Sequence, residues 1–175
     1  MPMRTILKTA LVLSFAVSVA IPALAASGAQ AYSNPRFGYT AEIPPNFVKL
    51  SEAGNGDGAT FRDEEDKADL LVFGTNLGEE SFSGELKGRI RSEKDDGWAL
   101  TYEKVTDGWA SYSGTKGATV VYARAIALCD GNAALFRIEY PKEKLKAFDA
   151  IVEVMVKALK PAEGCVASGA APAAQ

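Results

Sequence analysis

The chain has 175 residues, of which 47% are hydrophobic, and a formal net charge of −3. An acidic balance speaks against a nucleic-acid-binding protein, because such proteins usually carry a basic patch. The sequence contains no histidine, which excludes Ser-His-Asp and Cys-His catalysis and any imidazole metal site. We therefore expect neither a metal ion nor another cofactor.

The first 25 residues have the pattern of a signal peptide. Arg4 and Lys8 precede the apolar stretch 10–21, and Ala23-Leu24-Ala25 supplies the small residues of a cleavage site. We expect cleavage between Ala25 and Ala26. The apolar stretch is shorter than the ~20 residues of a membrane-spanning helix, so the mature protein should be exported, periplasmic or extracellular, without membrane insertion.

Two cysteines, Cys129 and Cys165, remain in a chain bound for an oxidising compartment. An even number of cysteines favours a disulfide there, and we expect this bond to contribute about 3–4 kcal/mol. The alternative is a pair of free thiols. A redox role is disfavoured, because the sequence has no Cys-x-x-Cys motif.

The mature chain predicts one domain, residues 34–165, between a flexible segment (26–33) and a disordered tail (166–175). Alternating apolar residues predict a first strand at 36–43, which ends at Pro44-Pro45. Further strands are expected at 47–50, 59–62 and 69–75. Phe82, Leu86 and Ile90 recur every four residues and predict a helix over 83–95.

The second half predicts a strand from Trp98, turns at 107–108 and 114–117, and a long central strand over 118–129. The odd positions of that strand (Val121, Ala123, Ala125 and Ala127) are mostly small, which would let a helix approach closely. A turn at 130–132 and an alternating strand over 133–140 follow. An apolar stripe predicts a helix between Pro141 and Pro161. This order indicates an α+β domain, an antiparallel β-sheet flanked by two main helices.

A strand and turn near the start, Gly38-Tyr39 followed by Pro44 to Phe47, resembles the Mog1/PsbP-like sandwich of small exported bacterial proteins. The element order over residues 34–161 is similar to that family as well. The resemblance implies a protein that is largely non-enzymatic and serves in assembly or as an accessory. No functional residue of the family carries over to a position of this chain.

Three short motifs could carry chemistry. Ser113 and Lys116 match the Ser-x-x-Lys pattern of some serine enzymes, but the glycines at 114 and 117 favour a solvated hairpin turn. The acidic stretch 57–69 could form a calcium site, but it lacks the ligand spacing of an EF-hand, and residues 63–66 favour a solvated turn. The glycines at 54, 56 and 58 precede a predicted strand, whereas a phosphate-binding loop precedes a helix.

Arg124 is the one charge inside the central apolar strand, and such a charge needs a partner or a purpose. The candidate binding face combines Arg124 and Arg137 with Trp98 and Tyr102. A polar stripe could run across this face through the following residues: Thr40, Glu42, Arg124, Arg137 and Glu139. The alternative is a cross-strand ion pair between Arg124 and Glu139. The aromatic residues of the meander, in turn, could simply fill the core.

These observations favour an exported, non-catalytic binding or accessory protein of the bacterial cell envelope. Its partner would be an unknown protein or small ligand, and we expect a monomer. A small envelope serine hydrolase using Ser113 and Lys116 is the alternative. A purely structural envelope or stress protein is the third reading.

Overall fold

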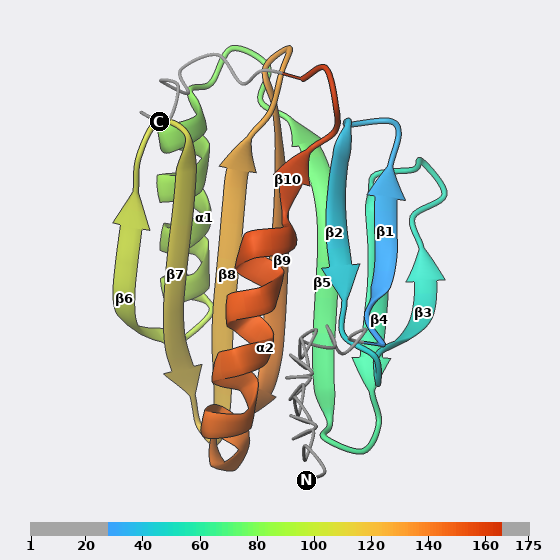
Figure 1. The fold of residues 1–175 in the computed structure, drawn as a ribbon. Helices are drawn as coiled ribbons and strands as arrows, with labels where there is room; N and C mark the ends of the chain where they lie inside the picture. Colours follow the sequence, from blue (N-terminus) through green and yellow to red (C-terminus); the bar gives the residue numbers. More distant parts are fainter. Residues whose placement is uncertain (1–27, 166–175) are drawn as a thin grey trace, which may run out of the picture.

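A seven-stranded antiparallel sheet forms the centre of the structure, in the order β3-β4-β5-β9-β8-β7-β6 (Figure 1). The computed structural model describes residues 28–165. A second, three-stranded sheet has the order β1-β2-β10. The strands are β1 (Gln30–Asn34), β2 (Tyr39–Ile43), β3 (Val48–Glu52), β4 (Gly58–Asp63), β5 (Ala68–Asn76), β6 (Ala99–Val105), β7 (Trp109–Lys116), β8 (Thr119–Ala127), β9 (Asn132–Pro141) and β10 (Lys160–Pro161).

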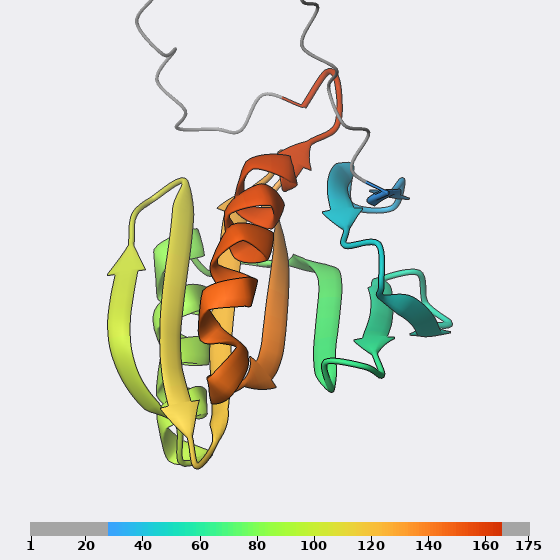
Figure 2. The same cartoon turned by 60° about the horizontal axis from the view of Figure 1, so that its bottom comes forward.

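Helix α2 (Leu145–Ala158) and the small sheet cover one face of the large sheet (Figures 1 and 2). A short 3-10 helix (Lys142–Lys144) precedes α2, so Pro141 ends β9 instead of opening the helix. Phe148 and Met155 of α2 are buried, and the Phe148 ring stacks on Tyr140 with 4.3 Å between centroids. This apolar contact attaches the helix to the centre of the sheet.

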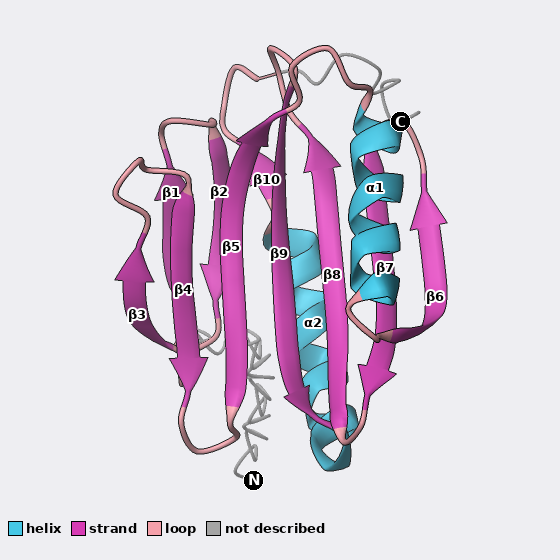
Figure 3. Ribbon diagram, turned by 180° about the vertical axis from the view of Figure 1, so that it is seen from behind, coloured by secondary structure: helices cyan, strands magenta, loops and turns pink. Residues whose placement is uncertain are grey.

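Helix α1 (Phe82–Asp95) covers the opposite face (Figure 3). Its buried side chains Phe82 and Leu86 belong to a core cluster that includes Ala125 and Ala127 of β8. The small residues at the odd positions of β8 therefore receive a helix, as the sequence predicts. Ser81 caps α1, because its side-chain oxygen accepts the backbone N–H of Gly84.

Each helix covers only part of its sheet face. Figure 1 shows α2 in front of β8 and β9, while β6 and β7 lie beside it with no helix or strand in front. Figure 3 shows the converse on the other face, where α1 leaves β4 and β5 uncovered. A sheet covered in halves by two helices leaves polar side chains of the uncovered strands free to face solvent.

The predicted α+β class with two main helices is confirmed, and so is the disulfide between Cys129 and Cys165. The prediction of a flexible segment over 26–33 is wrong for residues 30–33, because β1 pairs with β2 there. The predicted signal peptide, its cleavage site and the tail 166–175 lie outside the described residues. Within the described range, no helix is long and apolar enough to cross a membrane.

The disulfide joins the turn after β8 to the segment after β10, across 36 positions of sequence. Replacing both cysteines by alanine should lower the free energy of unfolding by about 3–4 kcal/mol, because the unfolded chain regains the entropy of the open loop. Urea denaturation of both proteins measures this difference. A reductant should lower the midpoint of the wild type and leave that of the double variant unchanged. Equal midpoints for the two oxidised proteins would contradict the prediction.

Candidate functional site

Arg124 projects from the middle of β8 to the sheet face that carries α2. Pairing of β7 with β8 places Ser111 opposite Arg124, and Arg124 Nη1 donates a hydrogen bond of 3.2 Å to Ser111 Oγ. Ser111 is only 2% exposed and also accepts a hydrogen bond from the hydroxyl of Tyr122, at 3.3 Å. The buried serine thus holds the arginine and the tyrosine together.

The Trp109 ring supports the guanidinium. Arg124 Cζ lies 4.2 Å from the ring centroid, in cation–π contact. The backbone of Trp109 is held by Thr106, whose Oγ1 accepts the Trp109 N–H at 3.0 Å and donates to the Trp109 carbonyl at 2.8 Å. The tight turn between β6 and β7 therefore fixes the backbone from which the Trp109 ring projects.

Arg124 forms no ion pair with any carboxylate of residues 28–165. Its Nε atom is buried without a hydrogen-bond partner. Burial lowers the pKa of the guanidinium, and only the phenols of Tyr122 and Tyr102 oppose this shift. A half-buried cation without a counter-charge lowers the stability of the folded protein. Packing alone therefore does not explain why an arginine occupies position 124.

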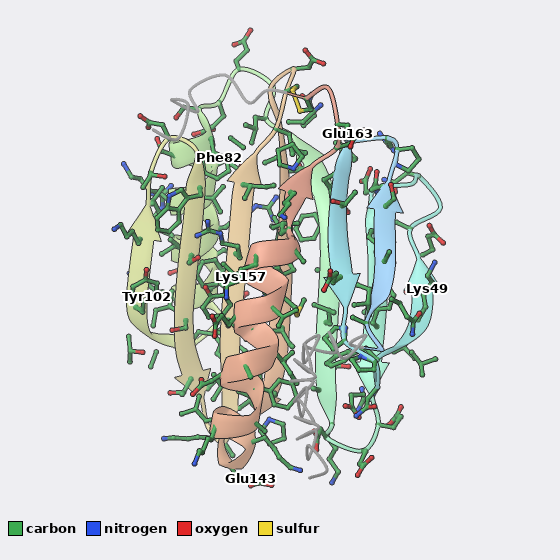
Figure 4. The ribbon with its side chains drawn as sticks, viewed as in Figure 1. Lys49, Phe82, Tyr102, Glu143, Lys157 and Glu163 are labelled. Atoms are coloured by element: carbon green, nitrogen blue, oxygen red, sulfur yellow. A yellow bond between two sulfur atoms is a disulfide. The ribbon has the colours of Figure 1, made fainter. Side chains whose placement is uncertain are left out.

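The side chains around Arg124 form two rows across β6, β7 and β8. Strand pairing aligns Lys104, Ser111 and Arg124 in one row, and aligns Tyr102, Ser113 and Tyr122 in the next. Figure 4 shows Tyr102 on β6, beside the part of the sheet that α2 covers. We call this surface the Arg124 face: Tyr102, Lys104, Trp109, Ser111, Ser113, Tyr122 and Arg124.

The Arg124 face offers hydrogen-bond donors and positive charge, but no paired nucleophile and base. Guanidinium and hydroxyl groups hydrogen-bond oxyanions such as carboxylates. None of its hydroxyls is hydrogen-bonded to a general base within the described chain. The arrangement is therefore suited to binding an anionic group.

The Ser113–Lys116 pair that the hydrolase alternative requires does not form. Both residues lie in β7, three positions apart, and side chains three apart point to opposite faces of a strand. The Nζ atom of Lys116 donates instead to the carbonyl of Asp96, at 2.6 Å. The expected hairpin turn at 114–117 is also wrong in part, because β7 continues through Lys116 and the chain turns at Gly117.

The predicted binding face divides into two pairs on opposite sides of the sheet. Arg124 and Tyr102 lie on the α2 side. Arg137 and Trp98 lie on the α1 side, where the Arg137 guanidinium is 5.3 Å from the Trp98 ring centroid. The reason is register: Arg124 pairs with Phe136, so Arg137 is one position out of phase with it and points the other way.

The predicted polar stripe and its alternative are both wrong. Glu139 makes its ion pair with Arg137 and not with Arg124. Thr40 and Glu42 belong to β2 in the small sheet. The sequence predicts no role for Lys104 and Ser111 of the Arg124 face, and suggests Ser113 only as the serine of a hydrolase. The alternation of polar residues along 109–115 is the sequence signal that could have indicated them.

Arg137 is satisfied by carboxylates, in contrast to Arg124. Its Nε donates to Glu93 Oε1 at 2.6 Å and its Nη2 to Glu93 Oε2 at 3.0 Å. Burial alone would raise the pKa of the Glu93 carboxyl, but hydrogen bonds and charge from Arg137 outweigh it, so this pKa is lowered. The hydroxyl of Tyr112 also donates to Glu93. This cluster joins α1 to β9.

Residues 64–67 of the acidic stretch form the turn between β4 and β5. The Asp63 side chain accepts the backbone N–H groups of Glu65 and Asp66 at 3.0 and 3.1 Å. Among residues 28–165, no group of three or more Cys, Asp or Glu side chains is placed to hold a metal ion.

No family model and no curated protein matches the sequence. A solved structure does match: cyanobacterial PsbP (CyanoP) from Synechocystis sp. PCC 6803, with a TM-score of 0.59 and 13% identity. The match covers 82% of this chain and 98% of the cyanobacterial chain. The chain has a PsbP-like fold. This likeness bears out the expected sandwich, and at this identity it concerns the fold alone.

The Arg137–Glu93 pair predicts a pH-dependent stability. Glu93→Gln should lower the free energy of unfolding by about 1.5–3 kcal/mol at pH 7, since it weakens charge-assisted hydrogen bonds. The folded pKa of Glu93 is below the ordinary value of 4.5. The contribution is therefore complete above that value and is lost as the pH falls below it.

Urea denaturation of the wild type and of Glu93→Gln between pH 7 and pH 3 measures this effect. The difference between their free energies of unfolding should become smaller as the pH falls. Glu85→Gln is the matched control. It removes the more exposed pair of Glu85 with Arg89 on the same helix, and should cost less than about 1 kcal/mol. A Glu93→Gln effect as small as the control would contradict the prediction.

Removing the charge of Arg124, unlike removing that of Glu93, should not lower the stability of the protein. Arg124→Met removes an uncompensated charge and leaves an unbranched side chain over Trp109. We expect the free energy of unfolding to stay unchanged or to rise by up to about 1 kcal/mol. Thermal and urea denaturation measure the change. A loss larger than about 1 kcal/mol would show that Arg124 is there for stability.

Proposed function

We propose that the protein is an exported, non-catalytic binding or accessory protein of the bacterial cell envelope, and that the Arg124 face contacts its partner. The observation that carries the proposal is the half-buried Arg124 guanidinium, which no carboxylate of the described chain neutralises. Proteins retain a charged residue that lowers stability where that residue has a function, such as binding a partner. An external anionic group would complete its interactions.

Other features support a binding role. The Arg124 face holds no nucleophile hydrogen-bonded to a base, and Ser113 and Lys116 point apart. A disulfide is typical of compartments outside the cytosol, in agreement with the predicted signal peptide. The PsbP-like fold agrees with the accessory role that the sequence resemblance implies.

The shape of the Arg124 face favours a protein partner over a small ligand. Its side chains stand on neighbouring strands of an open sheet, beside α2 (Figure 4). Small molecules bind in concave sites that enclose most of their surface, whereas protein partners bind to broad, open surfaces. A monomer that docks through this surface is the form we propose.

Site-specific photo-crosslinking tests the proposal. A photoreactive amino acid at Tyr102, which is 45% exposed, should form a discrete protein adduct in the native bacterium. Adding Arg124→Gln should abolish that adduct. The control position is Val154, on α2, with an almost equal exposure of 46%. A purely structural protein would give no adduct at either position, and an adduct that survives Arg124→Gln would place the contact elsewhere.

A further inference from the structure

The Arg124 face carries a second cation beside the first. The Nζ atom of Lys104, on β6, lies 5.4 Å from the Trp109 ring centroid, and Arg124 Cζ lies 4.2 Å from the same point. The two cationic groups are therefore within about 10 Å of each other. Like Arg124, Lys104 forms no ion pair within residues 28–165.

The acidic residue of β6 points away from this pair of cations. Glu103 lies between Tyr102 and Lys104 in the strand, so its side chain projects to the α1 side. There it forms an ion pair of 2.7 Å with Lys94 of α1. The Arg124 face itself contains no carboxylate, so it is locally positive on a chain whose net charge is negative.

A separation of at most about 10 Å between the two cations is compatible with an extended polypeptide. Side chains at positions i and i+2 of a strand point to the same side and are separated by roughly 7 Å. Carboxylates with that separation can reach Lys104 and Arg124 together. The hydroxyls of Tyr102, Ser113 and Tyr122 form the next row of the face and can hydrogen-bond the backbone of such a segment.

The same contacts disfavour ligands that bind by stacking. Sugars and single-stranded nucleic acids use exposed aromatic faces. On the Arg124 face, Trp109 already has Arg124 and Lys104 against its ring. A ligand stacked on Trp109 would have to displace Arg124 or Lys104 from the ring. A carboxylate could form an ion pair with either cation without moving it.

We propose that the Arg124 face binds an extended acidic segment of a partner protein, with carboxylates of residues i and i+2 on Lys104 and Arg124. This inference rests on the proposed function, whose partner class it specifies. Ser111 acts as the positioning residue, because its hydroxyl fixes the guanidinium over Trp109.

A titration with defined peptides tests this inference. The probe is the blocked peptide Gly-Glu-Ser-Glu-Ser-Glu-Gly, and the readout is Trp109 fluorescence in a Trp98→Phe background, which leaves one tryptophan. We expect saturable binding that weakens with salt. Arg124→Gln and Lys104→Gln should each raise Kd at least tenfold. The matched control is Arg91→Gln, because Arg91 is an exposed arginine of α1 without an ion pair in the described chain.

The Ser111→Ala variant tests whether Ser111 positions the Arg124 guanidinium, without changing the charge of the face. It keeps both cations, so it should raise Kd by a smaller factor than Arg124→Gln while leaving the salt dependence of binding in place. Near-ultraviolet circular dichroism of each variant verifies that the fold is intact. An unchanged Kd for Ser111→Ala would overturn the positioning role.

Comparison probes define the contrary outcomes. A peptide with glutamine in place of glutamate should not bind, and equal binding would overturn the role of the carboxylates. Tighter binding of oligogalacturonate would replace the acidic peptide with an acidic glycan. Failure of the acidic peptide alongside an Arg124-dependent crosslink at Tyr102 would reject this inference and leave the proposed function standing. Failure of both would reject both.

Discussion

The register of β8 between β9 and β7 is the constraint on which the rest of the structure depends. Alternation along β8 sends Ala123 and Ala125 to α1, and sends Tyr122 and Arg124 to the other face. A slip of one position would put the arginine under α1 and remove the small residues that let this helix approach. The helices, the core and the Arg124 face therefore share one determinant.

Arg124 and Arg137 lie on adjacent strands but have different interaction partners. Arg137 is enclosed by carboxylates of Glu93 and Glu139 and joins α1 to β9. Arg124 has only a serine hydroxyl and an aromatic ring. The first arrangement compensates the cost of burying charge, and the second leaves it uncompensated. The contrast separates a residue that supports the fold from one that is available to a partner.

The uneven coverage of the sheet explains where a partner can dock. Helix α2 and the small sheet occupy the α2 side over β4, β5, β8 and β9, and leave β6 and β7 open (Figures 1 and 2). On this side, β6 and β7 carry the following polar residues: Tyr102, Lys104, Ser111 and Ser113. The core cluster under the helix is instead formed by aliphatic and aromatic residues such as Ile138 and Tyr140. A polar, open surface beside a rigid core agrees with an accessory protein that binds without enclosing its ligand.

The sequence by itself determined the α+β class, both helices, most strands and the disulfide. These follow from local periodicity and from two cysteines, which need no knowledge of tertiary contacts. It also singled out Arg124, since a charge within an apolar strand is visible in one segment alone. Only the tertiary structure decided that Arg137 and Trp98 lie on the opposite face, and that Lys104, Trp109 and Ser111 surround Arg124. Pairing register depends on turn geometry and on packing from both sides of the sheet, and a single strand does not encode which neighbour it meets.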